Sequence, residues 1–189
     1  MVTAASTSPD ITSRGYEVFR TIGLDSLQGP TAGNFIADHV KPKAVAVIHD
    51  KQQYGEGIAT AVKQTLESKG TKVVLFEGIN AGDKDFSAMV AKLKQAGVDF
   101  IYYGGYHPEL GLLLRQSAEK GLSAKFMGPE GVGNKEISAI AGPASEGLLL
   151  PCRSRSTRTH ATRRWLMRSK PKMKTPAVHS CSRLTPQYK

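Results

Sequence analysis

The first 150 residues of this 189-residue chain contain no cysteine and no tryptophan. Both cysteines, Cys152 and Cys181, and the single tryptophan, Trp165, lie beyond that point. The longer part therefore offers no thiolate for metal binding or nucleophilic catalysis. No apolar run approaches the roughly 18 to 20 residues that a membrane-spanning helix needs, and the start of the chain lacks the basic-then-apolar pattern of a signal peptide. As written, the sequence predicts neither a membrane span nor an export signal.

Acidic residues are absent from residues 151–189, which hold 11 of the 26 Lys and Arg. All 16 Asp and Glu lie before residue 151, together with 15 Lys and Arg, so this part is nearly neutral and the net charge of +10 belongs to the tail. A basic tail could bind nucleic acid or anionic lipid. The tail has little apolar periodicity and many Ser, Thr and Pro, which favours a disordered segment. We expect no nucleic-acid partner.

Strand-type and helix-type segments alternate through the first 150 residues. Short apolar runs, typical of strands covered on both faces, predict strands at residues 44–48, 72–76, 99–103, 124–127 and 147–150. Between the strands, apolar residues recur at helical spacing, as in Phe86, Met89, Val90 and Leu93. Glycines that would end helices precede three of the strands, at positions 70, 97 and 121. The pattern predicts an α/β fold with a doubly wound parallel sheet.

Three of the predicted strands end in clusters of tyrosine, glycine and acid. The clusters are HDKQQYGEG at residues 49–57, YYGGY at residues 102–106 and FMGPEG at residues 126–131. The carboxyl ends of parallel strands are where ligands bind in such sheets. We therefore expect Tyr54, Tyr106 and Glu130 to converge on one cleft.

The residue types in these clusters suit a free amino acid. Glu130 follows a glycine and a proline in an apolar segment, where a buried carboxylate is costly unless a cation meets it; a ligand ammonium would supply that cation. The phenols of Tyr54 and Tyr106 could bond to a carboxylate or cover it, although a buried structural role for Tyr106 stays open. Residues 3–7 (TAAST) add hydroxyls and accessible backbone groups. The set fits a zwitterion better than a phosphate or a sugar.

Other chemistries find weaker support. Residues 128–135 (GPEGVGNK) differ from a phosphate-binding loop, because Asn134 stands where the loop has lysine. The five histidines show no metal-protease spacing and no serine occupies a nucleophile elbow. We expect no enzyme activity, no metal and no cofactor. Acids at the ends of strands or starts of helices have an ordinary reading as caps or turn residues: Asp50, Asp85 and Asp99.

The motifs also carry a resemblance. HDKQQYGEG (49–57), YGGYHPE (103–109), FMGPEGV (126–132) and GLD with QGP (23–25, 28–30) are similar to the leucine/isoleucine/valine-binding proteins of bacterial branched-chain amino-acid ABC importers, from residue 1 to about 150. The resemblance implies a periplasmic, monomeric, two-lobed protein that closes by hinge motion on leucine, isoleucine, valine or a similar amino acid and delivers it to a membrane permease. A ligand-sensing receptor domain of the same fold is the alternative.

The resemblance also implies roles for individual residues. Thr7 and the backbone of Ala5 would hold the carboxylate and ammonium of the ligand from the first lobe. Glu130 would pair with the ammonium, while Tyr54 and Tyr106 would close over the ligand from the second lobe. Asp25 falls at the hinge crossing, with no assured ligand role.

The resemblance divides the chain into three parts. Residues 1–24 match a remnant of the first lobe and the hinge crossing, residues 25–150 match the second lobe, and residues 151–189 form a basic tail that we expect to be frameshifted and disordered. Relatives carry a signal peptide and roughly a hundred further residues before the point that matches residue 1. We therefore expect a fragment whose binding is impaired.

The tail has a reading-frame explanation. If the third base of each codon is joined to the first two bases of the next, synonymous codons for residues 165–176 can encode LVDAFKAKNEDP, and the stretch from Cys152 can encode PQSFDEDPRNQA. Both strings look like the continuation of the family sequence. We expect residues 151–189 to be a frameshifted reading.

Overall fold

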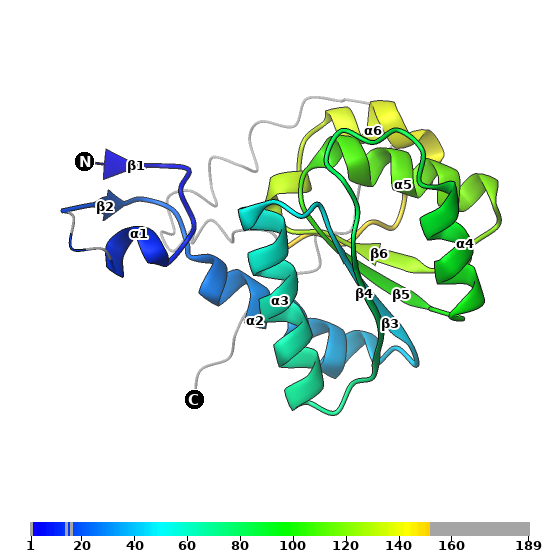
Figure 1. Cartoon of the computed structure of the whole chain (residues 1–189), viewed down its shortest axis with the longest axis horizontal. Coiled ribbons are helices and arrows are strands. Elements are labelled where there is room, and N and C mark those ends of the chain that lie inside the picture. Colours follow the sequence, from blue (N-terminus) through cyan, green and yellow to red (C-terminus); the bar gives the residue numbers. More distant parts are fainter. Residues whose placement is uncertain (1, 14, 16, 152–189) are drawn as a thin grey trace, which may run out of the picture.

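The computed structural model describes residues 2–13, 15 and 17–151. Its main feature is a four-stranded sheet of β3 (Val45–His49), β4 (Val73–Gly78), β5 (Phe100–Gly104) and β6 (Lys125–Met127). The strand order is β4-β3-β5-β6, and every neighbouring pair is parallel. Four of the five predicted strands are thus present within two residues of the expected limits. The predicted doubly wound parallel sheet is confirmed (Figure 1).

Helices cover both faces of this sheet. One face packs against α2 (Asp25–Phe35), its π-helical continuation η1 (Ile36–Val40) and α3 (Gln53–Ser68). The opposite face packs against α4 (Ser87–Gln95), α5 (His107–Glu119) and α6 (Glu136–Ala141). The short helices η2 (Glu130–Val132) and η3 (Gly142–Ser145) flank α6 in the chain. The result is a three-layer α/β/α body.

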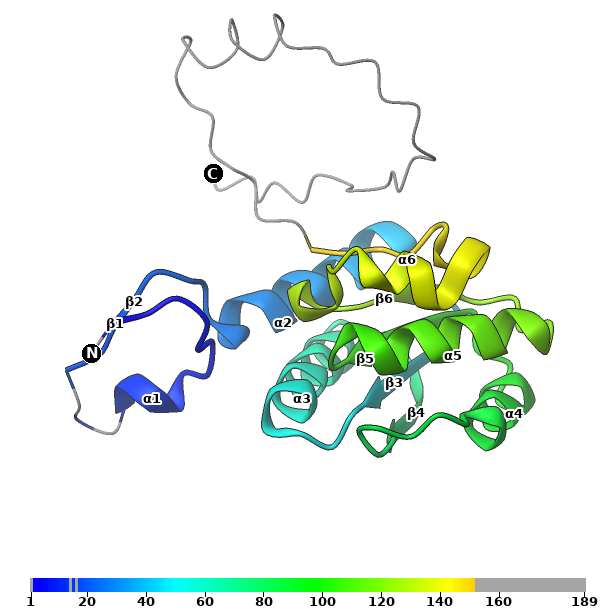
Figure 2. The same cartoon turned by 90° about the horizontal axis from the view of Figure 1, so that it is seen from above.

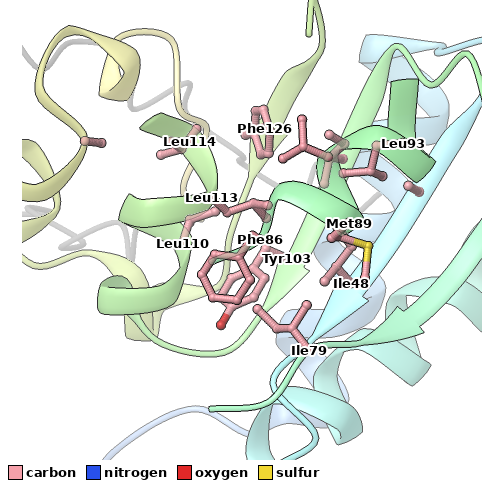
Figure 3. Packing of buried hydrophobic residues seen from close by; sticks show 14 of the residues in the cluster. Ile48, Ile79, Phe86, Met89, Leu93, Tyr103, Leu110, Leu113, Leu114 and Phe126 are labelled. Atoms are coloured by element: carbon pink, nitrogen blue, oxygen red, sulfur yellow. The ribbon is translucent and has the colours of Figure 1, made fainter. Parts of the chain in front are cut away.

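Side-chain alternation along β5 divides the core between the two faces. Phe100 and Tyr102 join the cluster beneath α2 and α3, whereas Ile101 and Tyr103 join the cluster beneath α4 and α5. Figure 3 shows the second cluster, where Tyr103 and Phe86 lie among the leucines of α5. All five residues of β3 and of β5 are buried, as expected for central strands of a parallel sheet.

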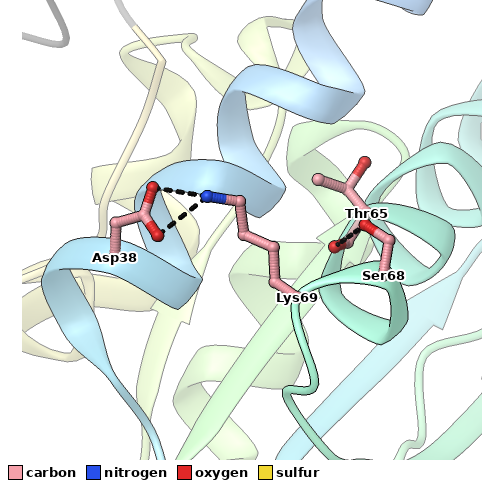
Figure 4. A network of polar contacts seen from close by, with 4 residues as sticks. All are labelled: Asp38, Thr65, Ser68 and Lys69. Carbon is pink, nitrogen blue, oxygen red and sulfur yellow. Dashed lines mark hydrogen bonds and ion pairs between the residues drawn. The ribbon is translucent and has the colours of Figure 1, made fainter.

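Three helices are followed by glycines, as the sequence predicts. Gly70, Gly97 and Gly121 follow α3, α4 and α5 with φ of 72°, 62° and 65°, the left-handed conformation that favours glycine. On the exposed side, the ammonium of Lys69 lies 2.7 Å from a carboxylate oxygen of Asp38 and ties the end of α3 to η1 (Figure 4). Such an exposed pair contributes at most about 1 kcal/mol.

The prediction of a fifth strand at residues 147–150 is wrong. Only Leu149 pairs with β6, in an isolated parallel bridge to Met127. Gly147 adopts φ 82°, which turns the chain immediately before the bridge. Because β6 itself has three residues, it offers too short a ladder for a full strand beside it.

A small separate layer precedes the body. It contains β1 (Val2–Thr3), the single-turn α1 (Asp10–Ser13) and β2 (Phe19–Arg20), and β1 pairs with β2 in parallel. Seen from above, these elements stand beside the α/β body at the start of α2 (Figure 2). α2 begins at Asp25, where the second lobe is expected to start. Of the expected tail, all but Pro151 lies outside the described residues.

Candidate functional site

The site is a cavity of about 730 Å³ between the N-terminal layer and the α/β body. Its walls come from residues 4–11 on one side and from the starts of α2, α3, α5 and η2 on the other. All five sequence-predicted site residues line it: Ala5, Thr7, Tyr54, Tyr106 and Glu130. The structure therefore brings together the strand-end clusters of β3, β5 and β6, as parallel topology predicts.

Tyr54 and Tyr106 form one wall of this cavity. Tyr54 lies in the first turn of α3 and Tyr106 directly precedes α5, and their ring centroids are 5.4 Å apart with an interplanar angle of 33°. Burial raises the pKa of the Tyr54 phenol well above its usual value. The Tyr54 phenol thus keeps its proton and can donate it. Tyr106 is 43% exposed, so the buried structural reading of Tyr106 is wrong.

Two glycines allow this wall to form. A Cβ on Gly55, in the first turn of α3, would lie 2.6 Å from the carbonyl oxygen of Gly104 and would collide with the Asp50 carboxylate. A Cβ on Gly104, at the end of β5, would collide with the carbonyl oxygen of Gly55. Only glycine lets the start of α3 approach the end of β5 this closely, and that approach places Tyr54 beside Tyr106.

Glu130 begins η2, directly after the buried segment 126–129. Its side chain is exposed, so the expectation of a buried carboxylate is wrong. The preceding residues are buried, but the chain turns at Pro129 into a short 3₁₀ helix, which directs Glu130 outward at the cavity edge. Within the described part of the chain, no Lys or Arg forms an ion pair with it. Its carboxylate is available to a cation in the cavity.

The opposite wall is the loop that carries Ala5 and Thr7. The hydroxyl oxygen of Thr3 accepts hydrogen bonds from the backbone N–H groups of Ala5 (3.4 Å) and Ser6 (3.1 Å). The N–H of Ala5 is therefore already engaged, which leaves its carbonyl oxygen as the backbone group that a ligand could use. The Ala5 carbonyl oxygen and the Thr7 hydroxyl oxygen are two acceptors that this loop offers to the cavity.

Asp25 is a cavity residue that the sequence did not assign to the site. It is the first residue of α2, lines the cavity, and accepts a 3.0 Å hydrogen bond at Oδ2 from the hydroxyl of Thr7. Burial raises the pKa of the Asp25 carboxyl, while the Thr7 hydrogen bond and the positive charge of Arg20 oppose this rise. No spacing signal joins residues 18 positions apart in a loop and a helix start, so the pairing could not be read from the sequence.

Of the three acids interpreted as caps or turn residues, Asp50 and Asp85 behave as expected, whereas Asp99 makes long-range contacts that the prediction missed. Asp50 and Asp85 each accept a hydrogen bond from the backbone N–H two residues later, at Gln52 (3.0 Å) and Ser87 (2.9 Å). Asp99 accepts from the backbone N–H groups of Lys43 and Ala44, across 56 and 55 residues. These carboxylates are occupied by backbone and stay out of the site.

A second cavity, of about 510 Å³, lies along the β6 side of the body. Its lining is mostly apolar, as at Phe35, Leu114 and Leu148, and it contains none of the predicted site residues. The polar residues of its lining are His39, Ser117, Lys125 and Glu146, none of which the sequence assigns to a ligand site. Within the described residues, no three His, Cys, Asp or Glu side chains gather as metal ligands. No helix of the described ranges has the length and apolar content of a membrane span.

A parallel α/β lobe with a polar cavity at its strand ends, facing a second small layer, has the architecture of a two-lobed binding protein. The chain matches the model of the periplasmic binding protein family over residues 1–182 and belongs to that family.

Curated relatives are similar along most of the chain. A leucine-, isoleucine-, valine-, threonine- and alanine-binding protein of Pseudomonas aeruginosa is 68% identical over 150 residues, which are 79% of this chain and 40% of that protein. A Leu/Ile/Val-binding protein of Escherichia coli K12 is 56% identical over 151 residues, 79% of this chain and 41% of its own length. The chain thus spans about two fifths of the length of these relatives.

Solved structures share the fold. A leucine binding protein, LivK, of Thermotoga maritima superposes with a TM-score of 0.78 at 29% identity, over 88% of this chain and 48% of that one. The branched-chain amino acid transporter substrate binding protein LivJ of Streptococcus pneumoniae, solved with isoleucine, gives a TM-score of 0.75 at 23% identity, over 86% of this chain and 47% of that one. The second likeness concerns the fold alone.

Proposed function

We propose that this chain is the substrate-binding component of a periplasmic ABC importer and binds branched-chain or related neutral amino acids without catalysis. The supporting observation is the convergence of Ala5, Thr7, Tyr54, Tyr106 and Glu130 on one cavity. The names of the relatives, which bind leucine, isoleucine and valine, agree with this assignment. The proposed partner is a membrane permease, and the proposed working form is a monomer in the periplasm.

The cavity offers groups that complement both charges of a zwitterion. The Glu130 carboxylate, the Ala5 carbonyl oxygen and the Thr7 hydroxyl oxygen suit an ammonium. The Tyr54 phenol, whose pKa burial raises, retains a proton to donate to a carboxylate. The aromatic pair and Ala61 supply apolar surface for a short aliphatic side chain. A phosphate or a sugar acid carries no positive group to pair with Glu130 and Asp25, so its repulsion by these carboxylates would go uncompensated, unlike that of an amino acid.

Binding is tested by titration calorimetry of the chain with leucine, valine and alanine. We expect binding heat with leucine and with valine. The affinity should be lower than that of a full-length, two-lobed relative, because a cavity enclosed on fewer sides forms fewer contacts with its ligand. Glu130→Gln should weaken leucine binding by about 1.5–3 kcal/mol, the contribution of a hydrogen bond to a charged group. Glu119→Gln, an exposed change on α5 outside the cavity, is the matched control. Absence of heat with all three amino acids would overturn the proposal for this chain.

A further inference from the structure

Thr7 and Asp25 are joined by two hydrogen bonds. The Thr7 hydroxyl lies 3.0 Å from Asp25 Oδ2, and the backbone N–H of Asp25 donates to the carbonyl oxygen of Thr7, also at 3.0 Å. A threonine hydroxyl has one proton, and an ionised carboxylate can only accept. Thr7 is therefore the donor, and its proton points toward Asp25.

This direction fixes what Thr7 can do in the cavity. With its proton committed, the Thr7 oxygen presents only lone pairs, which accept hydrogen bonds. Both Thr7 and Asp25 line the cavity. An ammonium or a ligand hydroxyl can donate to such an oxygen, but a carboxylate or a keto oxygen, which can only accept, cannot bond to it. The corner also carries the negative charge of Asp25, which disfavours an anionic group.

Among the described residues, the Asp25 side chain has few hydrogen-bond partners besides Thr7. Its Oδ1 atom is buried and has no hydrogen-bond partner among the described residues. In the part of the chain that the structure describes, the side-chain hydrogen bond that lowers the pKa of Asp25 comes from Thr7, and the positive charge of Arg20 also lowers it. The Asp25 carboxylate is thus the acceptor of the Thr7 proton, which fixes the direction of that proton.

We infer that Asp25 is a positioning residue that acts through Thr7: by taking the Thr7 proton, it makes this corner of the cavity select a ligand donor such as an ammonium over a keto oxygen, which can only accept. The inference rests on the proposed binding of amino acids and goes beyond it, because it assigns the discrimination between amino acids and their 2-keto analogues to a residue at the start of α2.

The test compares two ligands with the same side chain. In 4-methyl-2-oxopentanoate the ammonium of L-leucine is replaced by a keto oxygen, which can only accept a hydrogen bond. In Asp25→Ala, Thr7 regains a free proton, so we expect leucine affinity to fall by about tenfold while affinity for the keto acid stays the same or rises. Asp38→Ala, a carboxylate on η1 outside the cavity, should leave both affinities unchanged. Equal losses for both ligands in Asp25→Ala would indicate a purely structural role and overturn the inference.

A second measurement needs no ligand. A double-mutant cycle of Thr7→Val and Asp25→Ala, followed by urea unfolding of the unliganded chain, reports whether the two side chains interact. Non-additive effects support the hydrogen bond, and additive effects overturn the inference. If the unaltered chain binds neither ligand, the proposed function fails for this chain, and the cycle still decides whether Asp25 holds Thr7.

Discussion

The rings of Tyr54 and Tyr106 pack 5.4 Å apart, although α3 and α5 are separated in the chain by two strands and a helix. The contact arises because the first turn of α3 presses on the end of β5 through two glycines. One aromatic wall of the cavity is thus a consequence of parallel strand order combined with residues that lack a side chain.

Loss of the Tyr106 ring should weaken ligand binding. Tyr106→Ala removes half of the aromatic pair, which contributes about 0.5–1.5 kcal/mol beyond its buried area. We expect leucine affinity to fall at least several-fold, whereas Tyr106→Phe keeps the ring and should bind leucine within about twofold of the unaltered chain. Calorimetry with leucine checks both variants. If Tyr106→Phe loses as much leucine affinity as Tyr106→Ala, the hydroxyl and not the ring of Tyr106 contributes to leucine binding.

The close approach of α3 to β5 predicts opposite effects at two neighbouring glycines. Gly55→Ala would collide with Asp50 and Gly104 and should lower the free energy of unfolding by about 1–3 kcal/mol, as overpacking does. Gly57→Ala meets no atom within 4 Å and should raise it by about 0.5–1 kcal/mol, because alanine favours a helix. Urea unfolding of both variants decides the matter. A stable Gly55→Ala would contradict the proposed contact.

The strand-end rule accounts for how much of the site the sequence could predict. Tyr54, Tyr106 and Glu130 follow three apolar runs, and parallel strands bring their carboxyl ends to one edge, so their meeting required no knowledge of side-chain packing. The exposure of Glu130 depends on a local turn after Pro129, which an apolar neighbourhood in sequence does not reveal. The contribution of Asp25 depends on a contact between a loop and a distant helix start, which has no periodic signature.

The limits of the fold prediction have a similar cause. Continuous apolar runs predicted β3 and β5, because central strands are buried on both faces. The run at residues 147–150 has the same composition but lies beside a three-residue strand and follows a turn at Gly147. Composition reports whether a segment can be buried, whereas strand pairing depends on the partner that is present.

The origin of residues 151–189 is a prediction about the gene. The family model matches as far as residue 182, while the curated relatives align over 150 or 151 residues. We expect sequencing of the codons for residues 148–189 to show a shift of one base, after which the reading frame encodes the family continuation. An unbroken frame, together with an intact mass that includes the 11 basic residues of the tail, would reject the frameshift.

Two carboxyls should make stability depend on pH in opposite directions. Burial raises the pKa of Asp25 in the folded chain, so between its unfolded value, near 3.9, and its folded value the folded state holds more proton. Stability from this group therefore falls as pH rises. Burial also acts on Asp99, but hydrogen bonds from the backbone of Lys43 and Ala44 outweigh it and lower the pKa. Asp99 thus stabilises the fold above its unfolded pKa, and this is lost as pH falls through the folded pKa.

Urea unfolding between pH 3 and pH 7 separates the two effects. Asp25→Asn removes the titration while its amide oxygen can still accept from Thr7, so the variant should gain stability relative to the unaltered chain as pH rises from about 4. Asp99→Asn should lose stability relative to the unaltered chain as pH rises from 3 toward about 4, where Asp99 ionises in the unaltered chain and accepts from two backbone donors, for which an amide has one acceptor oxygen. Asp83→Asn, an exposed change in the loop before α4, is the control. Difference curves that slope in the same direction for Asp25 and Asp99 would contradict the assigned burial of Asp25, because only a carboxyl that favours its protonated form in the fold loses stability as it ionises.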